Sequence, residues 1–281
     1  MSEEQDFRLS FEFFPPKTDV GREKLKDVRA ELVKLNPDFF SVTYGAGGST
    51  RDNTKGIIKA MCSEGIDVAP HLSFGGDDEA TIEAMLAEYK SQGVKRLVAL
   101  RGDMPSGIGS AMQMVYANEL VAFIRRKFGD DFEIEVAAYP EIHPEAKSYL
   151  DDVRYLKGKF EAGANSAITQ YFFNPDAYFY FLEECKKEGI ENRIYPGIMP
   201  ITNFRNLARF SDACGAEIPR WMRKRLESYQ DNSESLTAFG IDLITELCET
   251  LLENGAPGLH FYTMNQIEPT RSIIENLGLN D

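Results

Sequence analysis

The sequence predicts an α/β fold, a single (β/α)8 TIM barrel with extra helices before its last strand. Eight short runs rich in β-branched and aromatic residues alternate with helical patterns along the 281 residues. Successive runs lie roughly 30 residues apart, which is the size of a βαβ unit. An open, doubly wound sheet would usually carry G-x-G-x-x-G after its first strand, and the sequence contains no such motif. Together these observations favour the closed barrel.

The predicted strands can be read directly from the sequence. In chain order they are Arg8–Phe14, Phe39–Tyr44, Asp67–Ser73, Arg96–Leu100, Glu133–Tyr139, Asn165–Gln170, Arg193–Ile198 and Gly258–Thr263. The glycine-rich segment Gly45–Thr50 (GAGGST) follows the second strand. Because glycine lets a backbone approach a ligand closely, this segment is either a ligand-binding loop or a plain tight turn between strand and helix.

Helical patterns fill the intervals between these strands. Segment Asp78–Gln92 predicts an amphipathic helix because its apolar residues recur at i, i+3, i+4 and i+7; they are Ile82, Met85, Leu86 and Tyr89. Leu236–Asn254 has a similar pattern. The last interval is longer than the others and predicts additional helices around Pro219–Tyr229 and Leu236–Asn254.

Composition and charge exclude several classes of protein. Hydrophobic residues make up 43% and charged residues 27% of the chain, which excludes a disordered, collagen-like or coiled-coil protein. No apolar run reaches the roughly 20 residues that would cross a bilayer. The formal charge of −14 disfavours nucleic-acid binding, because an acidic surface repels phosphate. One basic run, from Arg220 to Arg225, is either a solvated helix face or a docking site for an anionic substrate tail.

The termini and cysteines indicate a cytoplasmic protein of one domain. The acidic start MSEEQDFRLS lacks the apolar stretch of a signal peptide. The four cysteines form no C-x-x-C pair, and their scatter fits reduced thiols in the cytosol. No linker divides the chain, so we expect residues 1–281 to form one catalytic barrel without a regulatory domain.

Polar side chains interrupt the predicted strand ends, where barrel enzymes place their chemistry. Glu12 lies between Phe11 and Phe13 in the first strand. Burial disfavours the charged form, so we expect a raised pKa, which suits a general acid. The alternative is a structural ion pair within the barrel, with Arg101 as its partner.

The remaining polar positions support weaker hypotheses. Asp103, in the Arg-Gly-Asp segment after the fourth strand, is either a catalytic carboxylate or a turn former. His71, His143 and His260 all lie at or just after strand ends, but their spacing does not support a metal site. The sequence lacks the G-x-S-x-G elbow of a serine hydrolase.

At these same positions the chain resembles the methylenetetrahydrofolate reductase family. The resemblance spans about residues 8–277 and rests on nine segments in order: SFEFFPPK, SVTYGAGGST, PHLSF, LRGDMP, AAYPEIHPEA, AGANSAITQYFF, PGIMPITNF, IPRWM and HFYTMN. It implies a flavin-dependent barrel enzyme that uses FAD. The implied reaction reduces 5,10-methylenetetrahydrofolate to 5-methyltetrahydrofolate with NADH or NADPH, in a ping-pong cycle that supplies methyl groups for methionine synthesis.

The resemblance also implies roles for individual residues. Glu12 matches the general acid that helps to protonate N10 of the folate, and Asp103 matches the carboxylate that stabilises the folate cation. Gln170, Asn206, Phe210 and Gln266 match substrate-binding positions. The positions implied for FAD are Thr43, Tyr44, Ala46, His71, Arg101, Gly102, Asp103, Tyr116, Ala117, Tyr139, His143, Ala146, Asp152 and Lys159.

Three residues depart from the family pattern. Gln266 stands where an arginine is common, Asn206 where a glutamine is common, and Gly158 where a basic residue often helps to hold FAD. These departures concern affinity rather than reaction type. Two alternatives remain, a non-catalytic folate-binding subunit and another flavin-barrel oxidoreductase such as a proline dehydrogenase. We also expect a homo-oligomer, and no metal, nucleic-acid or membrane partner.

Overall fold

The predicted barrel is present, and its strands lie close to the predicted positions. The structure is a computed structural model that describes residues 7–44, 48–74, 77–101, 116–229 and 232–279. Its strands are β1 (Arg8–Phe13), β2 (Phe39–Val42), β3 (Val68–Leu72), β4 (Arg96–Ala99), β5 (Glu133–Ala138), β6 (Ser166–Thr169), β7 (Ile194–Tyr195), β8 (Gly197–Ile198) and β9 (Gly258–Tyr262). All pairings are parallel, in the order β7-β6-β5-β4-β3-β2-β1-β9-β8.

Strands β7 and β8 are the two halves of the predicted seventh strand, divided at Pro196. Proline has no N–H to donate to a ladder, so it interrupts regular pairing. Its carbonyl still accepts the N–H of His260 at 3.0 Å, and the N–H of Gly197 turns to the Thr169 hydroxyl at 2.9 Å. Since β7 pairs with β6 and β8 pairs with β9, this broken strand closes the barrel.

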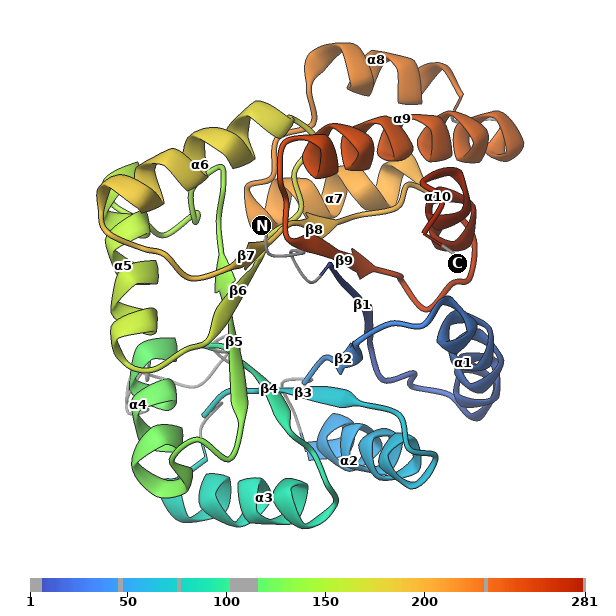
Figure 1. The fold of residues 1–281 in the computed structure, drawn as a ribbon. Helices are drawn as coiled ribbons and strands as arrows, with labels where there is room; N and C mark the ends of the chain where they lie inside the picture. Colours follow the sequence, from blue (N-terminus) through green and yellow to red (C-terminus); the bar gives the residue numbers. More distant parts are fainter. Residues whose placement is uncertain (1–6, 45–47, 75–76, 102–115, 230–231, 280–281) are drawn as a thin grey trace, which may run out of the picture.

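The helices form a ring around the strands (Figure 1). They are α1 (Asp19–Leu32), η1 (Val33–Leu35), α2 (Gly48–Ser63), α3 (Glu79–Ser91), α4 (Ala117–Phe128), α5 (Tyr149–Glu161), α6 (Pro175–Lys187), α7 (Phe204–Cys214), α8 (Arg220–Ser228), α9 (Ser233–Glu253) and α10 (Thr270–Asn276). The predicted extra helices before the last strand are confirmed as α8 and α9. The predicted stripe on α3 is confirmed as well, because its four apolar residues are all buried.

Side chains alternate between the two faces of the barrel strands. On β1, Leu9, Phe11 and Phe13 belong to the main core between strands and helices. The interior holds a second, smaller apolar cluster of Phe39, Ala69, Val98 and Ile168. The phenylalanines beside Glu12 in the sequence therefore pack on the opposite face from it, as the two-residue period of a strand requires.

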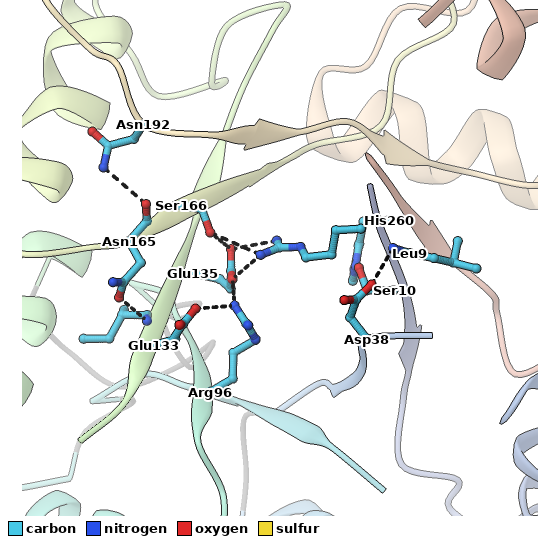
Figure 2. A network of polar contacts seen from close by, with 12 residues as sticks. Leu9, Ser10, Asp38, Arg96, Glu133, Glu135, Asn165, Ser166, Asn192 and His260 are labelled. Carbon is cyan, nitrogen blue, oxygen red and sulfur yellow. Dashed lines mark hydrogen bonds and ion pairs between the residues drawn. The ribbon is translucent and has the colours of Figure 1, made fainter. Parts of the chain in front are cut away.

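A charged cluster fills the barrel interior at the start of the strands. Glu135 is fully buried and accepts hydrogen bonds from Arg8 Nη1 at 2.9 Å, Arg96 Nη1 at 2.5 Å and Ser166 Oγ at 2.5 Å. Figure 2 shows Glu135 facing Arg96 and Ser166. The Arg8 guanidinium also lies 3.3 Å from the ring centroid of Tyr195. The cluster lies at the opposite end of β1 from Glu12 and fixes the strands of that end of the barrel together.

No helix among the described residues is long and apolar enough to span a membrane.

Candidate active site

The candidate active site centres on Glu12, at the carboxyl end of β1. Its carboxylate oxygen Oε2 lies 3.2 Å from His71 Nε2, 3.7 Å from His260 Nε2 and 3.4 Å from the Ser41 hydroxyl. These partners come from β3, β9 and β2. The Glu12 side chain remains 18% exposed whereas His260 is fully buried. Glu12 is therefore the member of this group that a substrate at the barrel mouth can reach.

The expected raised pKa of Glu12 is wrong. Burial raises the pKa, as expected, but the two imidazoles that face the carboxylate, His71 first and then His260, outweigh burial and lower the pKa to about 2. The free carboxylate is therefore ionised near neutral pH. The alternative pairing with Arg101 is wrong as well, because Arg101 forms a two-pronged ion pair with Glu145, at 2.5 and 2.9 Å.

Several of the residues expected to hold FAD lie together at the carboxyl ends of β4 and β5. Arg101 follows β4, and Tyr139 and His143 follow β5, with their rings in edge contact at 4.6 Å between centroids. The backbone N–H of His143 donates to the Asp152 carboxylate at 2.7 Å. Ala146, Tyr116 and Ala117 lie in the flanking loop and at the start of α4. Thr43 and Tyr44 follow β2, where the Thr43 N–H donates to the Phe13 carbonyl.

Lys159 projects from α5 toward the same region. Its ammonium group donates to the Ala137 carbonyl at 2.8 Å. Burial lowers the pKa of Lys159 to about 8, although Asp152 opposes the shift. Burial also raises the pKa of Asp152 and lowers that of His143. An anionic ligand near Lys159 would favour its charged form.

The loop between β5 and α5 carries backbone strain at this site. Ile142 has a φ of 90°, a conformation that β-branched residues rarely adopt. Its neighbours are held in place, because the Glu141 carboxylate accepts the Glu217 N–H at 2.8 Å and the His143 N–H is bound to Asp152. Strained backbone of this kind concentrates at ligand-binding and catalytic loops.

The expected substrate positions lie after β6 and β9 and on α7. Gln170 follows β6, and its side-chain oxygen accepts the N–H of Tyr171 at 3.0 Å. The Tyr171 hydroxyl lies 3.0 Å from that of Ser211, next to Phe210 on α7. Asn206 is exposed one helical turn before Phe210, and Gln266 follows β9. The structure thus brings Gln170 and Phe210 to neighbouring elements.

Three expected site residues, Ala46, Gly102 and Asp103, lie outside the described residues. Sequence reasoning also missed two residues of the group around Glu12. Ser41 contacts its carboxylate, and Ser10 contacts His260, which faces the same carboxylate. The two-residue period of a strand was the available signal, since Ser10 and Glu12 share one face of β1.

Within the described part of the chain, no group of three or more histidine, cysteine and carboxylate side chains could hold a metal ion. The basic run lies on α8, where Lys224 pairs with Glu227, so part of its charge is neutralised on the helix surface. Docking of an anionic tail there stays a prediction.

Comparison with known proteins identifies the family. The family model of methylenetetrahydrofolate reductase matches residues 1–278. The 5,10-methylenetetrahydrofolate reductase of Escherichia coli strain K12 is 39% identical over 272 residues, covering 96% of this chain and 90% of the relative. Methylenetetrahydrofolate reductase (NADH) 1 of Arabidopsis thaliana is 38% identical over 298 residues, covering 100% of this chain and 50% of the plant protein.

A solved structure supports the fold. A protein from Clostridium thermocellum that binds two copies of 5-methyl-5,6,7,8-tetrahydrofolic acid aligns with a TM-score of 0.65 at 18% identity, covering 98% of this chain and 94% of that chain. At that identity the likeness concerns the barrel alone. Since the family model spans nearly the whole chain and the bacterial relative matches it at 39% identity, the chain belongs to the methylenetetrahydrofolate reductase family.

Proposed function

We propose that this chain reduces 5,10-methylenetetrahydrofolate to 5-methyltetrahydrofolate, with FAD as its redox group and NADH or NADPH as the donor. Family membership supports the reaction. The structural observation that carries the proposal is the partly exposed Glu12 carboxylate at the barrel mouth, within reach of two imidazoles. The reaction needs a proton donor next to the folate, and the Glu12 carboxyl group can hold that proton. The product would supply methyl groups for methionine synthesis.

The residues at the ends of β4 and β5 fit an FAD. Two cationic side chains, Arg101 and Lys159, lie near each other, since each influences the pKa of His143. Lys159 is half-buried, and burial disfavours the charge of its ammonium group, so a phosphate would compensate that cost. Tyr139 and His143 offer aromatic and polar contacts beside them. FAD, when bound, would accept hydride from the nicotinamide and pass it to the folate in a ping-pong cycle.

Glu12 would act together with His71. Because the free carboxylate is ionised, its proton must reach it from a neighbour, and His71 Nε2 is 3.2 Å away. In this proposal Glu12 Oε2 takes up a proton from this side of the site as the folate covers the mouth and displaces water. Glu12 then donates it to N10, and the bridging carbon stays on N5 as a cation. The carboxylate left behind stabilises that cation electrostatically.

The substitution Glu12→Gln tests this assignment. We expect it to abolish folate reduction and to leave flavin reduction by NADH or NADPH largely intact, since only the folate half needs the acid. Anaerobic stopped-flow spectra measure both halves. Glu141→Gln is the matched control, because Glu141 is another half-buried carboxylate whose contact, the Glu217 N–H, an amide oxygen can still accept. Equal losses in both half-reactions of Glu12→Gln would remove Glu12 from the role.

An anaerobic visible spectrum of the purified protein separates the proposed function from its alternatives. Bound flavin should bleach with NADH or NADPH and recover its colour with methylenetetrahydrofolate. Flavin that bleaches without recovering would indicate another flavin-barrel oxidoreductase. Protein that neither contains nor takes up FAD would indicate a folate-binding subunit without turnover.

We also propose a cytoplasmic homo-oligomer. The four cysteines are free, which fits a reducing compartment. Leu150, Tyr155 and Tyr180 are exposed on the neighbouring helices α5 and α6, at 42%, 53% and 52%. Exposed large apolar side chains on adjacent helices are a feature of subunit contacts, which supports this proposal. Sedimentation of the native protein tests this, and Tyr155→Glu should shift it toward the monomer.

A further inference from the structure

Side chains join β1 and β9 beyond the point where the backbone pairing of the two strands ends. The last paired residues are Glu12 and Tyr262. One residue further along the chain, the Thr263 hydroxyl donates to the Glu12 carbonyl at 2.7 Å. Thr263 is buried, so water cannot easily take the place of this contact. The segment after β9 is therefore still held to the end of β1 after the regular ladder has ended.

The side-chain amide of Asn265 continues this connection. Its oxygen accepts the Phe14 N–H at 3.0 Å, and its nitrogen donates to the Phe14 carbonyl at 2.8 Å. An asparagine side chain offers both an acceptor and a donor, as a peptide unit does. Asn265 therefore pairs with the Phe14 backbone as a neighbouring strand would, and it ties the loop after β9 to the loop after β1.

Residues 263–266 form a tight turn whose backbone is strained. The Gln266 N–H donates to the Thr263 carbonyl at 3.0 Å, and the Asn265 N–H donates to the Thr263 hydroxyl at 3.2 Å. The two central residues, Met264 and Asn265, have positive φ values of 52° and 56°. Positive φ at both central positions is typical of a type I′ turn, which favours glycine, asparagine and aspartate. Asn265 suits this turn, whereas Met264 adopts a conformation that its side chain disfavours.

The turn sets the position of Gln266, which we expect to contact the folate. The Gln266 N–H is held by Thr263, and the preceding residue is held by Phe14. Among the described residues, none forms a hydrogen bond with the Gln266 side-chain amide, so this amide is available to a ligand. Strained backbone persists only where surrounding contacts hold it, and it concentrates at ligand-binding sites. The contacts of Asn265 thus hold a strained turn next to a candidate substrate-binding residue.

We infer that Asn265 is a positioning residue for the folate: by clamping the Phe14 backbone, it fixes the turn that presents Gln266 relative to the strand that carries Glu12. Asn265 acts through Gln266 and need not touch the folate itself. The role in binding rests on the proposed function, whereas the clamp between Asn265 and Phe14 does not.

The uncharged side chain of Gln266 makes this clamp more important. The family commonly has an arginine at this position, and the attraction between two charges weakens gradually with distance. A hydrogen bond from a neutral amide weakens steeply when its angle departs from the preferred range. A chain with glutamine at this position therefore depends more on the exact placement of the turn than a chain with arginine would.

Loss of the clamp should weaken folate binding rather than slow the chemistry. Asn265→Gly removes both hydrogen bonds to Phe14 but permits the same turn, because glycine adopts positive φ readily. We expect the Kd for 5-methyltetrahydrofolate to rise about 5- to 10-fold, as for the loss of one typical hydrogen bond. The KM for methylenetetrahydrofolate should rise equally, with kcat changed less than about twofold, since uniform binding alone is lost.

Hydrogen exchange of the protein without ligands tests the clamp itself. Phe14 lies beyond the end of β1, so the protection of its N–H depends on the Asn265 oxygen. Nuclear magnetic resonance should show exchange of the Phe14 N–H at least about tenfold faster in Asn265→Gly than in the native protein. Equal exchange rates of this N–H in the two proteins would overturn the inference.

A double-mutant cycle tests whether Asn265 acts through Gln266. Gln266→Ala removes the amide that the turn presents and should raise the Kd for 5-methyltetrahydrofolate to a similar extent. The clamp then has nothing left to position, so Asn265→Gly/Gln266→Ala should bind the folate no more weakly than Gln266→Ala. Isothermal titration calorimetry measures the four affinities. Losses that multiply in the double variant would show that the two residues act independently, and would overturn the positioning role.

The matched control is Asn254→Gly. Asn254 precedes β9 at the opposite end of the same strand, and its side-chain nitrogen donates to the Thr250 carbonyl at 2.8 Å. This variant also loses an asparagine contact with the backbone, and it should keep the native Kd and KM for the folates. A rise in Kd equal to that of Asn265→Gly would indicate a general structural effect and would count against the inference.

The outcomes separate this inference from the proposed function. Native protein that does not bind 5-methyltetrahydrofolate would overturn the binding role together with the proposed function, even where the Phe14 N–H is protected. Native protein that binds the folate, with an unchanged Kd in Asn265→Gly, would overturn the positioning role alone.

Discussion

Replacing Glu135 with glutamine should destabilise the barrel strongly, because it removes one charge and almost no volume. Glu135 is fully buried and accepts two hydrogen bonds from Arg8, at 2.9 and 3.1 Å, one from Arg96 and one from Ser166. Removing one partner of a buried ion pair costs about 3–5 kcal/mol, since the remaining charge is left uncompensated. Arg8 is 8% exposed, so water cannot take over the role of the carboxylate.

Two features place the expected loss at the lower end of that range. The Arg8 guanidinium keeps its contact with the Tyr195 ring, which is worth about 0.5–2 kcal/mol. Arg96 keeps the carboxylate of Glu133 at 2.9 Å. We therefore expect a loss of about 3–4 kcal/mol in the free energy of unfolding, and a fall in Tm of roughly 10 °C.

Urea denaturation of native protein and Glu135→Gln measures this loss. The control is Glu23→Gln, which removes an exposed ion pair with Lys26 and should cost about 0–1 kcal/mol. The double variant Arg8→Met/Glu135→Leu should be more stable than Glu135→Gln, because it removes both charges of the pair. A loss below about 1 kcal/mol in Glu135→Gln, equal to that of the surface control, would refute the argument that this cluster holds the strands together.

The pH dependence has a defined sign. Burial alone would raise the pKa of Glu135, but Arg8 and Arg96 outweigh it and lower the pKa. The stability that Glu135 contributes is therefore complete above the unfolded pKa of about 4.3 and is lost as the pH falls through the lower folded value. In Glu135→Gln, which has no carboxylate at this position, this fall in stability at acidic pH should be absent.

Further predictions concern cofactor binding and barrel closure. The pKa of Lys159 in the free protein is about 8, and an adjacent phosphate favours its charged form, so the affinity for FAD should fall as the pH rises through that value. Fluorescence titration at two pH values measures this affinity. Lys159→Met should bind FAD more weakly, with an affinity that does not change with pH in this range. Gly197→Ala should disrupt barrel closure, since a Cβ there would lie 2.2 Å from the Thr169 carbonyl oxygen and 2.7 Å from the Tyr262 ring. Circular dichroism melting would show the loss, and a native Tm would contradict it.

The sequence predicts the barrel well because strand and helix positions depend on local patterns. The helix predicted at Asp78–Gln92 is found at Glu79–Ser91, and the predicted first residue is its cap, with the Asp78 carboxylate accepting the Thr81 N–H. The division of the seventh strand at Pro196 was not predicted, although the proline was its signal. Its effect depends on β9, more than 60 residues away, whose His260 N–H binds the Pro196 carbonyl.

The site was predicted less completely, and Glu12 shows the physical reason. Its sequence neighbours Phe11 and Phe13 suggest an apolar environment, but they pack on the outer face of the barrel. The groups that act on the carboxylate, Ser41, His71 and His260, come from three other strands. Burial is encoded locally, whereas the compensating imidazoles are encoded by strand order and register. Burial therefore raises the pKa of Glu12, as predicted, but the net change in that pKa is a decrease.

The register between β1 and β9 also determines the surroundings of the Glu12 carboxylate. On β1, one interior face carries Arg8, Ser10 and Glu12, and β9 sets His260 opposite Ser10. A shift of one residue between these strands would turn His260 outward and leave His71 as the one imidazole beside Glu12, which raises the pKa of Glu12. The closing contacts of the barrel around Pro196 and Gly197 hold β9 in this register. A substitution at the broken strand should therefore alter the acid at the mouth as well as stability, so that Gly197→Ala protein that still folds should show a pH profile of the folate half-reaction shifted to higher pH.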